Sequence, residues 1–217
     1  MDLREALYTT RAMRRVSADP IPAEVQARIL DAAIRAPSGG NAQNWRFLLI
    51  DDHDVKAQLG PLYRECMDML WSTYYAPRIA AAEAEPDSAD SKQFFRVKRS
   101  AQHLADEFEK YPLLLFAFAQ HDPSGGSIFP AVWSAMLAAR GEGVGSALTS
   151  VLAFKAAETH AVLNVPDGEG WHMAACVTFG YPTGKWDVAP RTPVEEVTFH
   201  NAWGAPLSIR VDGPLFP

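Results

Sequence analysis

A short basic segment near the start of the chain carries residues whose types and spacing could do chemistry. Arg11, Arg14 and Arg15 fall within five consecutive positions. Guanidinium groups form short, charge-assisted and often bidentate hydrogen bonds to phosphate oxygens. Taken alone, such a cluster is also typical of a solvated face, so a phosphate site and an exposed basic surface both remain open from these residues.

A second polar segment follows about 25 positions later. Ser38-Gly-Gly-Asn41 and Gln43 offer a hydroxyl, side-chain amides and uncovered backbone N–H groups, and the two glycines permit positive φ. Such groups suit the polar ring edge and ribityl chain of a flavin. In isolation the segment also reads as an ordinary turn between a helix and a strand.

The elements that must position these segments can be read from hydrophobic periodicity. Helices are expected over residues 3–13, 22–36, 54–75, 127–139 and 154–163, and strands over 47–50, 111–119 and 172–179, with a strand edge or turn at 146–151. Residues 83–91 predict a mobile surface loop between helices. The long helical insert between the first two strands does not suit a doubly wound parallel sheet, so the pattern favours an α+β fold.

Bulk properties exclude several classes of protein. The formal net charge of −6 argues against a nucleic-acid binder, which needs clustered cations. Cys66 and Cys176 are the only cysteines and give neither a disulfide framework nor a zinc site, which fits a reducing cytosol. The N-terminus lacks the apolar core of a signal peptide, and no apolar run is long enough to span a membrane. We therefore expect a cytoplasmic protein that binds neither nucleic acid nor membrane.

Other chemical motifs fail on spacing. Gly141-Glu-Gly143-Val-Gly145 has GxGxG rather than GxGxxG spacing and follows a helix, so no Rossmann site is expected. The six histidines show no HxH or HExxH pattern, so no metal site is expected, and no GxSxG elbow indicates a hydrolase. An aromatic group could wall a substrate pocket or pack in the core: Trp71, Tyr74, Tyr75, Phe94 and Phe95.

The two polar segments together resemble a known family. Thr10-Arg-Ala-Met-Arg-Arg15 is similar to the amino-terminal phosphate motif of the nitroreductase family, and residues 36–47 resemble its Ala-Pro-Ser-Ser-Gly-Asn-x-Gln-Pro-Trp-x-Phe signature. The resemblance continues through residues 127–149, 180–182 and 191–197 and is least in residues 54–110. Thr10, Ala12 and Asn44 replace a frequent arginine, serine and proline, and Trp133-Ser134 replaces a frequent Gln-Asn pair.

The resemblance implies a site for FMN. It places the phosphate near Arg11, Arg14 and Arg191, with Ala12 and Met13 contributing through the backbone and Arg15 compensating for the lost arginine. The ribityl chain and ring would be bordered by residues of the second polar segment: Pro37, Ser38, Gly39, Asn41 and Gln43. Leu148 and Thr149, in the expected strand edge or turn at 146–151, would approach the ring from the other side. No catalytic side chain is identified.

The resemblance also implies a fold, an assembly and a reaction. The fold would be α+β, a three-layer α/β/α arrangement with a mainly antiparallel central sheet, formed by one domain over residues 1–217 in an intertwined homodimer with FMN at the interface. A lid would lie at about 70–100 and a C-terminal dimer arm at about 200–217.

The implied activity is that of an FMN-dependent oxidoreductase, which passes hydride from NADPH or NADH to a nitroaromatic, quinone or related small aromatic acceptor by a ping-pong mechanism. Two alternatives stay open: a specialised flavin-dependent reductase or dehydrogenase of a metabolite, and a non-catalytic FMN-sequestering protein.

Overall fold

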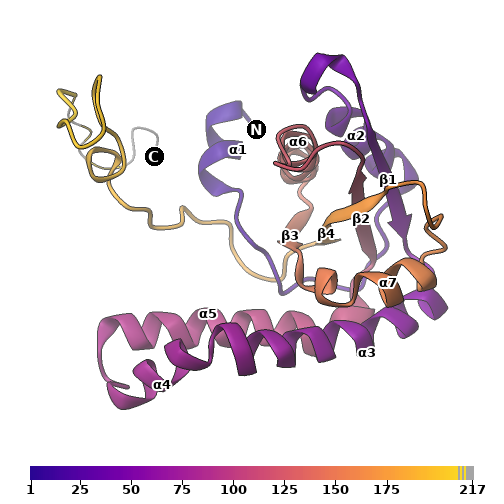
Figure 1. The fold of residues 1–217 in the computed structure, drawn as a ribbon, viewed down its shortest axis with the longest axis horizontal. Coiled ribbons are helices and arrows are strands. Elements are labelled where there is room, and N and C mark those ends of the chain that lie inside the picture. The colour runs from indigo at the N-terminus through magenta and orange to yellow at the C-terminus, as the bar shows by residue number, and fades with distance from the viewer. Residues whose placement is uncertain (210, 212, 214–217) are drawn as a thin grey trace.

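The central sheet has four strands, which pair only in antiparallel fashion (Figure 1). The computed structural model describes residues 1–209, 211 and 213. The strands are β1 (Trp45–Ile50), β2 (Leu113–Ala119), β3 (Gly145–Thr149) and β4 (His172–Gly180), in the order β1-β2-β4-β3. The mainly antiparallel sheet that the family resemblance implies is confirmed. The region 146–151, for which the sequence left a strand edge or a turn open, contains most of β3, and β3 lies at one edge of the sheet.

Helices cover both faces of the sheet and make a three-layer fold, which confirms the predicted class. One face packs against α2 (Ala23–Ala33) and α6 (Ile128–Gly141), and the other against α3 (His53–Met69), α7 (Ala156–Val162) and the end of α5 (Ala89–Asp106). All of β2 is buried because its alternate side chains enter the two cores. Three 3-10 helices complete the body: Gly39–Asn41, Phe108–Lys110 and Val151–Lys155.

A long helical hairpin extends beyond the sheet (Figure 1). α3 continues through a π-helical turn, Leu70–Tyr74, into α4 (Ala76–Ala84), and α5 returns to the sheet. The loop predicted over residues 83–91 is wrong at both ends, since only residues 85–88 are non-helical. Ser88 caps α5 by accepting a hydrogen bond from the backbone N–H of Ser91, and the alanine-rich sequence of α4 favours helix up to the turn.

The N-terminal helix is shorter than the periodicity predicts. α1 spans Leu3–Thr9 rather than residues 3–13. Met13 does not continue its apolar stripe, because the Met13 N–H donates to the carbonyl of Ser146 on β3 at 2.9 Å. Ala12 forms a parallel bridge with Ser146, and the Ser17 N–H donates to the carbonyl of Tyr181. The arginine-rich segment is therefore an extended strip along the free edge of β3 and the end of β4.

The C-terminal segment packs against the rest of the protein at Trp186 and then extends away from the sheet and its helices (Figure 1). The Arg140 guanidinium lies 4.0 Å from the ring centroid of Trp186, and it also pairs with Glu5 at 3.1 Å. Beyond this point the chain makes a 3-10 turn, Val194–Glu196, and then a compact turn in which the ring centroids of Phe199 and Trp203 lie 5.0 Å apart. Of the arm predicted over about 200–217, Leu215 and Phe216 lie outside the described residues.

Candidate functional site

The backbone of the arginine segment is held by residues distant in sequence. The Tyr111 hydroxyl donates to the Arg14 carbonyl at 2.6 Å. The Thr183 N–H donates to the Arg15 carbonyl at 3.0 Å. Since Tyr111 is almost fully buried and begins the approach to β2, it anchors Arg14 to the core of the protein.

The side chain of Arg14 is partly buried without a carboxylate. Among the described residues its hydrogen-bond partner is Ser100 on α5, whose Oγ lies 3.3 Å from Arg14 Nη1, and it has no ion pair. Burial lowers the pKa of Arg14, whereas nearby Tyr63 and Tyr111 raise it. An arginine remains charged in proteins in any case. A partly desolvated guanidinium that lacks a counter-ion is a suitable site for an anion.

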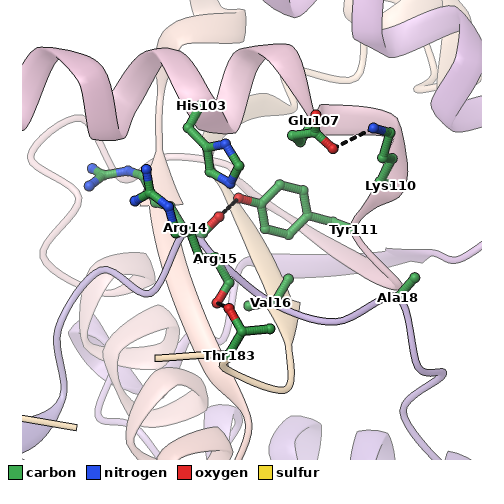
Figure 2. A pocket seen from close by; sticks show the side chains of 9 residues that line it. All are labelled: Arg14, Arg15, Val16, Ala18, His103, Glu107, Lys110, Tyr111 and Thr183. Atoms are coloured by element: carbon green, nitrogen blue, oxygen red, sulfur yellow. Dashed lines mark hydrogen bonds and ion pairs between the residues drawn. The ribbon is translucent and has the colours of Figure 1, made fainter. Parts of the chain in front are cut away.

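A cavity of about 300 Å³ opens beside this segment. Figure 2 shows the Tyr111 hydroxyl directed at the Arg14 carbonyl, with the imidazole of His103 beside this contact. Within it, Lys110 pairs with Glu107 at 2.6 Å. The cavity is lined by Arg14, Arg15, Val16, Ala18, His103, Glu107, Lys110, Tyr111 and Thr183. The lining residues of α5 and of the 3-10 turn after it were not predicted, because tertiary contact alone brings them to the arginines.

The second polar segment forms a tight, exposed loop before β1. Gly40, Asn41 and Gln43 have φ of 58°, 53° and 51°. The Gln43 N–H donates to Ser38 Oγ at 3.1 Å, and the Gly39 N–H donates to Ser127 Oγ at 3.2 Å. These bonds hold the loop in a conformation that costs non-glycine residues free energy, a feature that clusters at ligand-binding sites.

A cavity of about 370 Å³ lies beside this loop. It is lined by Ser38, Gly39, Ala42, Gln43, Asn44, Gln120, His121, Asp122, Pro123, Ser124, Gly126 and Ser127. Asp122 accepts from the backbone N–H groups of Ser127 and Ile128, so it holds the start of α6 beside the loop. Pro37 is exposed at the entry to the same loop.

The two predicted residues of β3 face opposite ways. Leu148 is 39% exposed, whereas Thr149 is buried. The Thr149 hydroxyl lies 3.0 Å from the Tyr63 hydroxyl and accepts from the Val151 N–H at 3.3 Å. Because this hydroxyl is turned inward, a ligand outside β3 would meet the Leu148 side chain and the backbone at Thr149.

The described chain divides the predicted site residues into separate groups. Ala12 and Met13 lie against β3, whereas the loop of residues 38–43 precedes β1, and β1 and β3 are opposite edges of the sheet. Three strand spacings separate these edges, or about 14 Å. Arg191 is exposed in the C-terminal segment, where it donates to the Pro190 carbonyl at 3.0 Å. A single chain therefore does not bring all the predicted residues to one place.

In residues 1–209, 211 and 213, no group of three or more histidine, cysteine, aspartate or glutamate side chains is placed to hold a metal ion. No helix in the described part of the chain combines the length and apolarity needed to cross a membrane.

Comparison with known proteins gives a consistent family. A sequence model of the nitroreductase family matches residues 7–181. The chain is 26% identical over 202 residues to an NADH dehydrogenase of Thermus thermophilus, covering 91% of this chain and 95% of that protein. It is 28% identical over 194 residues to a 5,6-dimethylbenzimidazole synthase of Rhodobacter capsulatus, covering 83% of each.

Solved structures share the fold. An iodotyrosine deiodinase bound to FMN and 3-iodo-L-tyrosine superposes with a TM-score of 0.70 at 23% identity, covering 89% of this chain and 96% of that one. The FMN- and NADPH-dependent nitroreductase NfnB of Sphigopyxis sp. strain HMH gives a TM-score of 0.69 at 20% identity, covering 94% and 100%. At these identities the likeness establishes the architecture.

Proposed function

Since this chain belongs to the nitroreductase family, we propose that it is an FMN-dependent oxidoreductase that passes hydride from NAD(P)H to a nitroaromatic, quinone or related acceptor. The observation that carries the proposal is the partly buried, unpaired guanidinium of Arg14, on a segment that distant residues fix in place. Its charge and the exposed donors of the 38–43 loop fit the phosphate and the polar edge of FMN.

The proposed division of labour follows the positions of the residues. Arg11, Arg14 and Arg191 bind the phosphate, with the backbone of Ala12 and Met13, and Arg15 supplements their charge. Leu148 and the backbone at Thr149 lie along the ring, and the 38–43 loop supplies the remaining polar contacts with Pro37 at its edge. FMN, when bound, would supply the hydride-transfer chemistry, and the chain's own groups would hold its ring and exclude water from it.

A second copy of the chain is part of the proposal. The predicted residues lie at opposite edges of one sheet, so a homodimer would complete each site by joining the β3 edge of one copy to the 38–43 loop of the other. Exposed apolar side chains support such an assembly. Trp203 is 94% exposed on the C-terminal segment, and Phe129 and Trp133 on α6 are each 42% exposed. Burial of these side chains against a partner would be favourable.

We further propose that residues 1–217 act as one unit and that the tip of the helical hairpin, about residues 70–100, is a lid over the acceptor. Aromatic side chains gather there: Tyr74, 72% exposed, stacks on Phe154 with ring centroids 5.5 Å apart. Tyr75 and Phe94 lie nearby, with centroids 6.2 Å apart. An aromatic acceptor would find complementary rings on this surface.

A second candidate reaction is the reduction or dehydrogenation of a specialised metabolite. The 28% identity to a 5,6-dimethylbenzimidazole synthase over most of both chains favours it, because the same fold and family then serve a dedicated metabolic reaction. A screen of acceptors on the reduced protein separates the two candidates. Rapid oxidation by many quinones and nitroaromatics supports the first, and oxidation confined to one metabolite class supports the second.

The proposal is tested by the cofactor and its reduction. The purified protein should retain FMN, and anaerobic NADPH or NADH should bleach the visible flavin absorbance. Arg14→Ala should weaken FMN binding by about 10- to 150-fold, since a charge-assisted hydrogen bond contributes about 1.5–3 kcal/mol. Arg28→Ala is the matched control, because Arg28 is an exposed arginine of α2 that pairs with Glu142.

Two results would overturn the proposal. If the protein does not take up FMN, the whole proposal is refuted. Retention of FMN that neither nicotinamide donor bleaches refutes the NAD(P)H-dependent reaction and leaves the metabolite dehydrogenase and the FMN-sequestering function, which bleaching of the flavin by a metabolite would separate.

A further inference from the structure

Helix α5 carries a basic face that FMN binding does not require. Positions 92, 96, 99, 100 and 103 recur at helical spacing. Two of them define where this face is directed, because Ser100 accepts from Arg14 and His103 lines the cavity shown in Figure 2. Arg96 precedes Ser100 by four residues and therefore lies on the same face, and Arg99 lies at its margin.

The arginines on this face and on the facing segment are uncompensated, whereas Lys92, farther along the same face, pairs with Asp87 at 3.1 Å. Arg11, Arg15, Arg96 and Arg99 form no ion pair among the described residues. Four other surface arginines have carboxylate partners: Arg28 with Glu142, Arg35 with Asp31, Arg64 with Glu109 and Arg78 with Asp90. Among the described residues, Arg46 and Arg191 instead donate to backbone carbonyls and have no ion pair. The contrast is informative because the chain is acidic overall, with a formal net charge of −6. A cluster of unpaired guanidinium groups in an acidic protein marks a site for anions.

The number of charges exceeds what one phosphate needs. A phosphomonoester carries about −1.5 to −2 charge at neutral pH, which the proposed phosphate ligands Arg11, Arg14 and Arg191 already neutralise. Arg96 and Arg99 remain. They lie three residues apart on α5, or about 4.5 Å along the helix axis. The ligand for this face is therefore a second anionic group in addition to the FMN phosphate.

We propose that the basic face of α5 binds the phosphate groups of the nicotinamide donor and selects NADPH, through its 2′-phosphate, over NADH. This inference rests on the proposed function, which requires such a donor to approach the same site. A dinucleotide whose nicotinamide lies over the flavin must place its adenosine end elsewhere on the surface. The α5 face starts beside Arg14 and runs away from the sheet along the helical hairpin, which provides that surface (Figure 1).

The binding test uses redox-inactive probes on the FMN-loaded protein. Calorimetry should show that adenosine 2′,5′-bisphosphate binds at least about tenfold more tightly than adenosine 5′-monophosphate. Arg96→Gln and Arg99→Gln should each weaken binding of the bisphosphate by about tenfold without changing FMN content. Lys98→Gln is the matched control, because Lys98 lies on the opposite face of α5, 5.3 Å from the ring centroid of Trp71.

A kinetic measurement adds a second readout. In Arg96→Gln, KM for NADPH should rise by about tenfold while KM for NADH stays unchanged, since NADH lacks the 2′-phosphate. Equal effects on both donors would overturn the inference, as would bisphosphate binding no tighter than that of the monophosphate. Loss of FMN from Arg96→Gln or Arg99→Gln would also overturn it, by showing that α5 belongs to the FMN site. A wild-type protein that binds the bisphosphate but never FMN would instead refute the proposed function.

Discussion

Replacing Gly145 by alanine should damage both the stability of the protein and its affinity for FMN. Gly145 begins β3 and faces the arginine segment. A Cβ at this position would lie 2.8 Å from Met13 Cβ, 2.8 Å from Pro182 Cγ and 3.3 Å from the Gly180 carbonyl oxygen. Ordinary van der Waals contact between carbon atoms begins at about 3.4 Å. The new Cβ would therefore lie about 0.6 Å too close to Met13 Cβ and to Pro182 Cγ. Neither neighbour is a flexible side-chain end, so the segment containing Met13 must move.

The size of the effect follows from the cost of overpacking. Extra methyl groups in well-packed positions cost about 1–3 kcal/mol. Urea unfolding of the FMN-free protein should show a loss of this size. The displaced segment should also move Arg14 away from the phosphate. If the binding free energy of FMN falls by the same 1–3 kcal/mol, the Kd for FMN rises by about 5- to 150-fold. Gly184→Ala is the control, because a Cβ at Gly184 would meet no atom within 4 Å.

Separate outcomes refute separate steps. An unchanged free energy of unfolding in Gly145→Ala would show that the chain near Met13 and Pro182 can move aside without loss of stability, and would refute the predicted overpacking. Lower stability with unchanged FMN affinity, measured by fluorescence titration, would show that the position of the arginine segment does not control FMN binding.

Three further predictions concern other parts of the molecule. Tyr63→Phe should lower the free energy of unfolding by about 1 kcal/mol, since it removes the hydrogen bond to Thr149, and an unchanged urea midpoint would contradict this. Burial raises the pKa of Glu109, but the hydrogen bond from Arg64, a backbone hydrogen bond and the positive charges of Arg64 and Lys110 together lower it by more, so the folded pKa lies below the unfolded value near 4.5. This pair should stabilise the protein above that pH and lose its effect as the pH falls through the folded pKa; Glu109→Gln should therefore destabilise at neutral pH and become neutral in acid. Trp203→Ser should weaken the proposed dimer, as sedimentation at several concentrations will detect, and an unchanged dissociation constant would exclude Trp203 from the interface.

Some elements follow from local sequence because a single environment decides them. The apolar run before and within β2 can remove all its side chains from water only in a strand that is buried on both faces. β2 is such a strand. The apolar spacing of Val25, Ile29 and Ala33 gives α2, whose three side chains are buried in one core. The tight loop at residues 38–43 likewise follows from its glycines and amide side chains.

Other elements depend on contacts that local sequence does not encode. Met13 fits a helical stripe, yet pairing with Ser146 draws it into an extended strip and ends α1 at Thr9. The contribution of Tyr111 depends on a bond to Arg14 across 97 positions of sequence. The basic spacing on α5 was readable from the sequence, but its relevance depends on the contact between Ser100 and Arg14.

The attachment of the arginine segment has a consequence for the order of folding. Its carbonyl at Arg15 accepts from Thr183, 168 positions later in the chain. Contacts of such separation form late, because a large loop must close before they contribute free energy. During synthesis, the contacts of the segment with Tyr111 and Ser146 can form before those with Tyr181 and Thr183. A truncated product ending before β4 would lack the last two contacts, so we expect it to hold Arg14 and Arg15 less firmly.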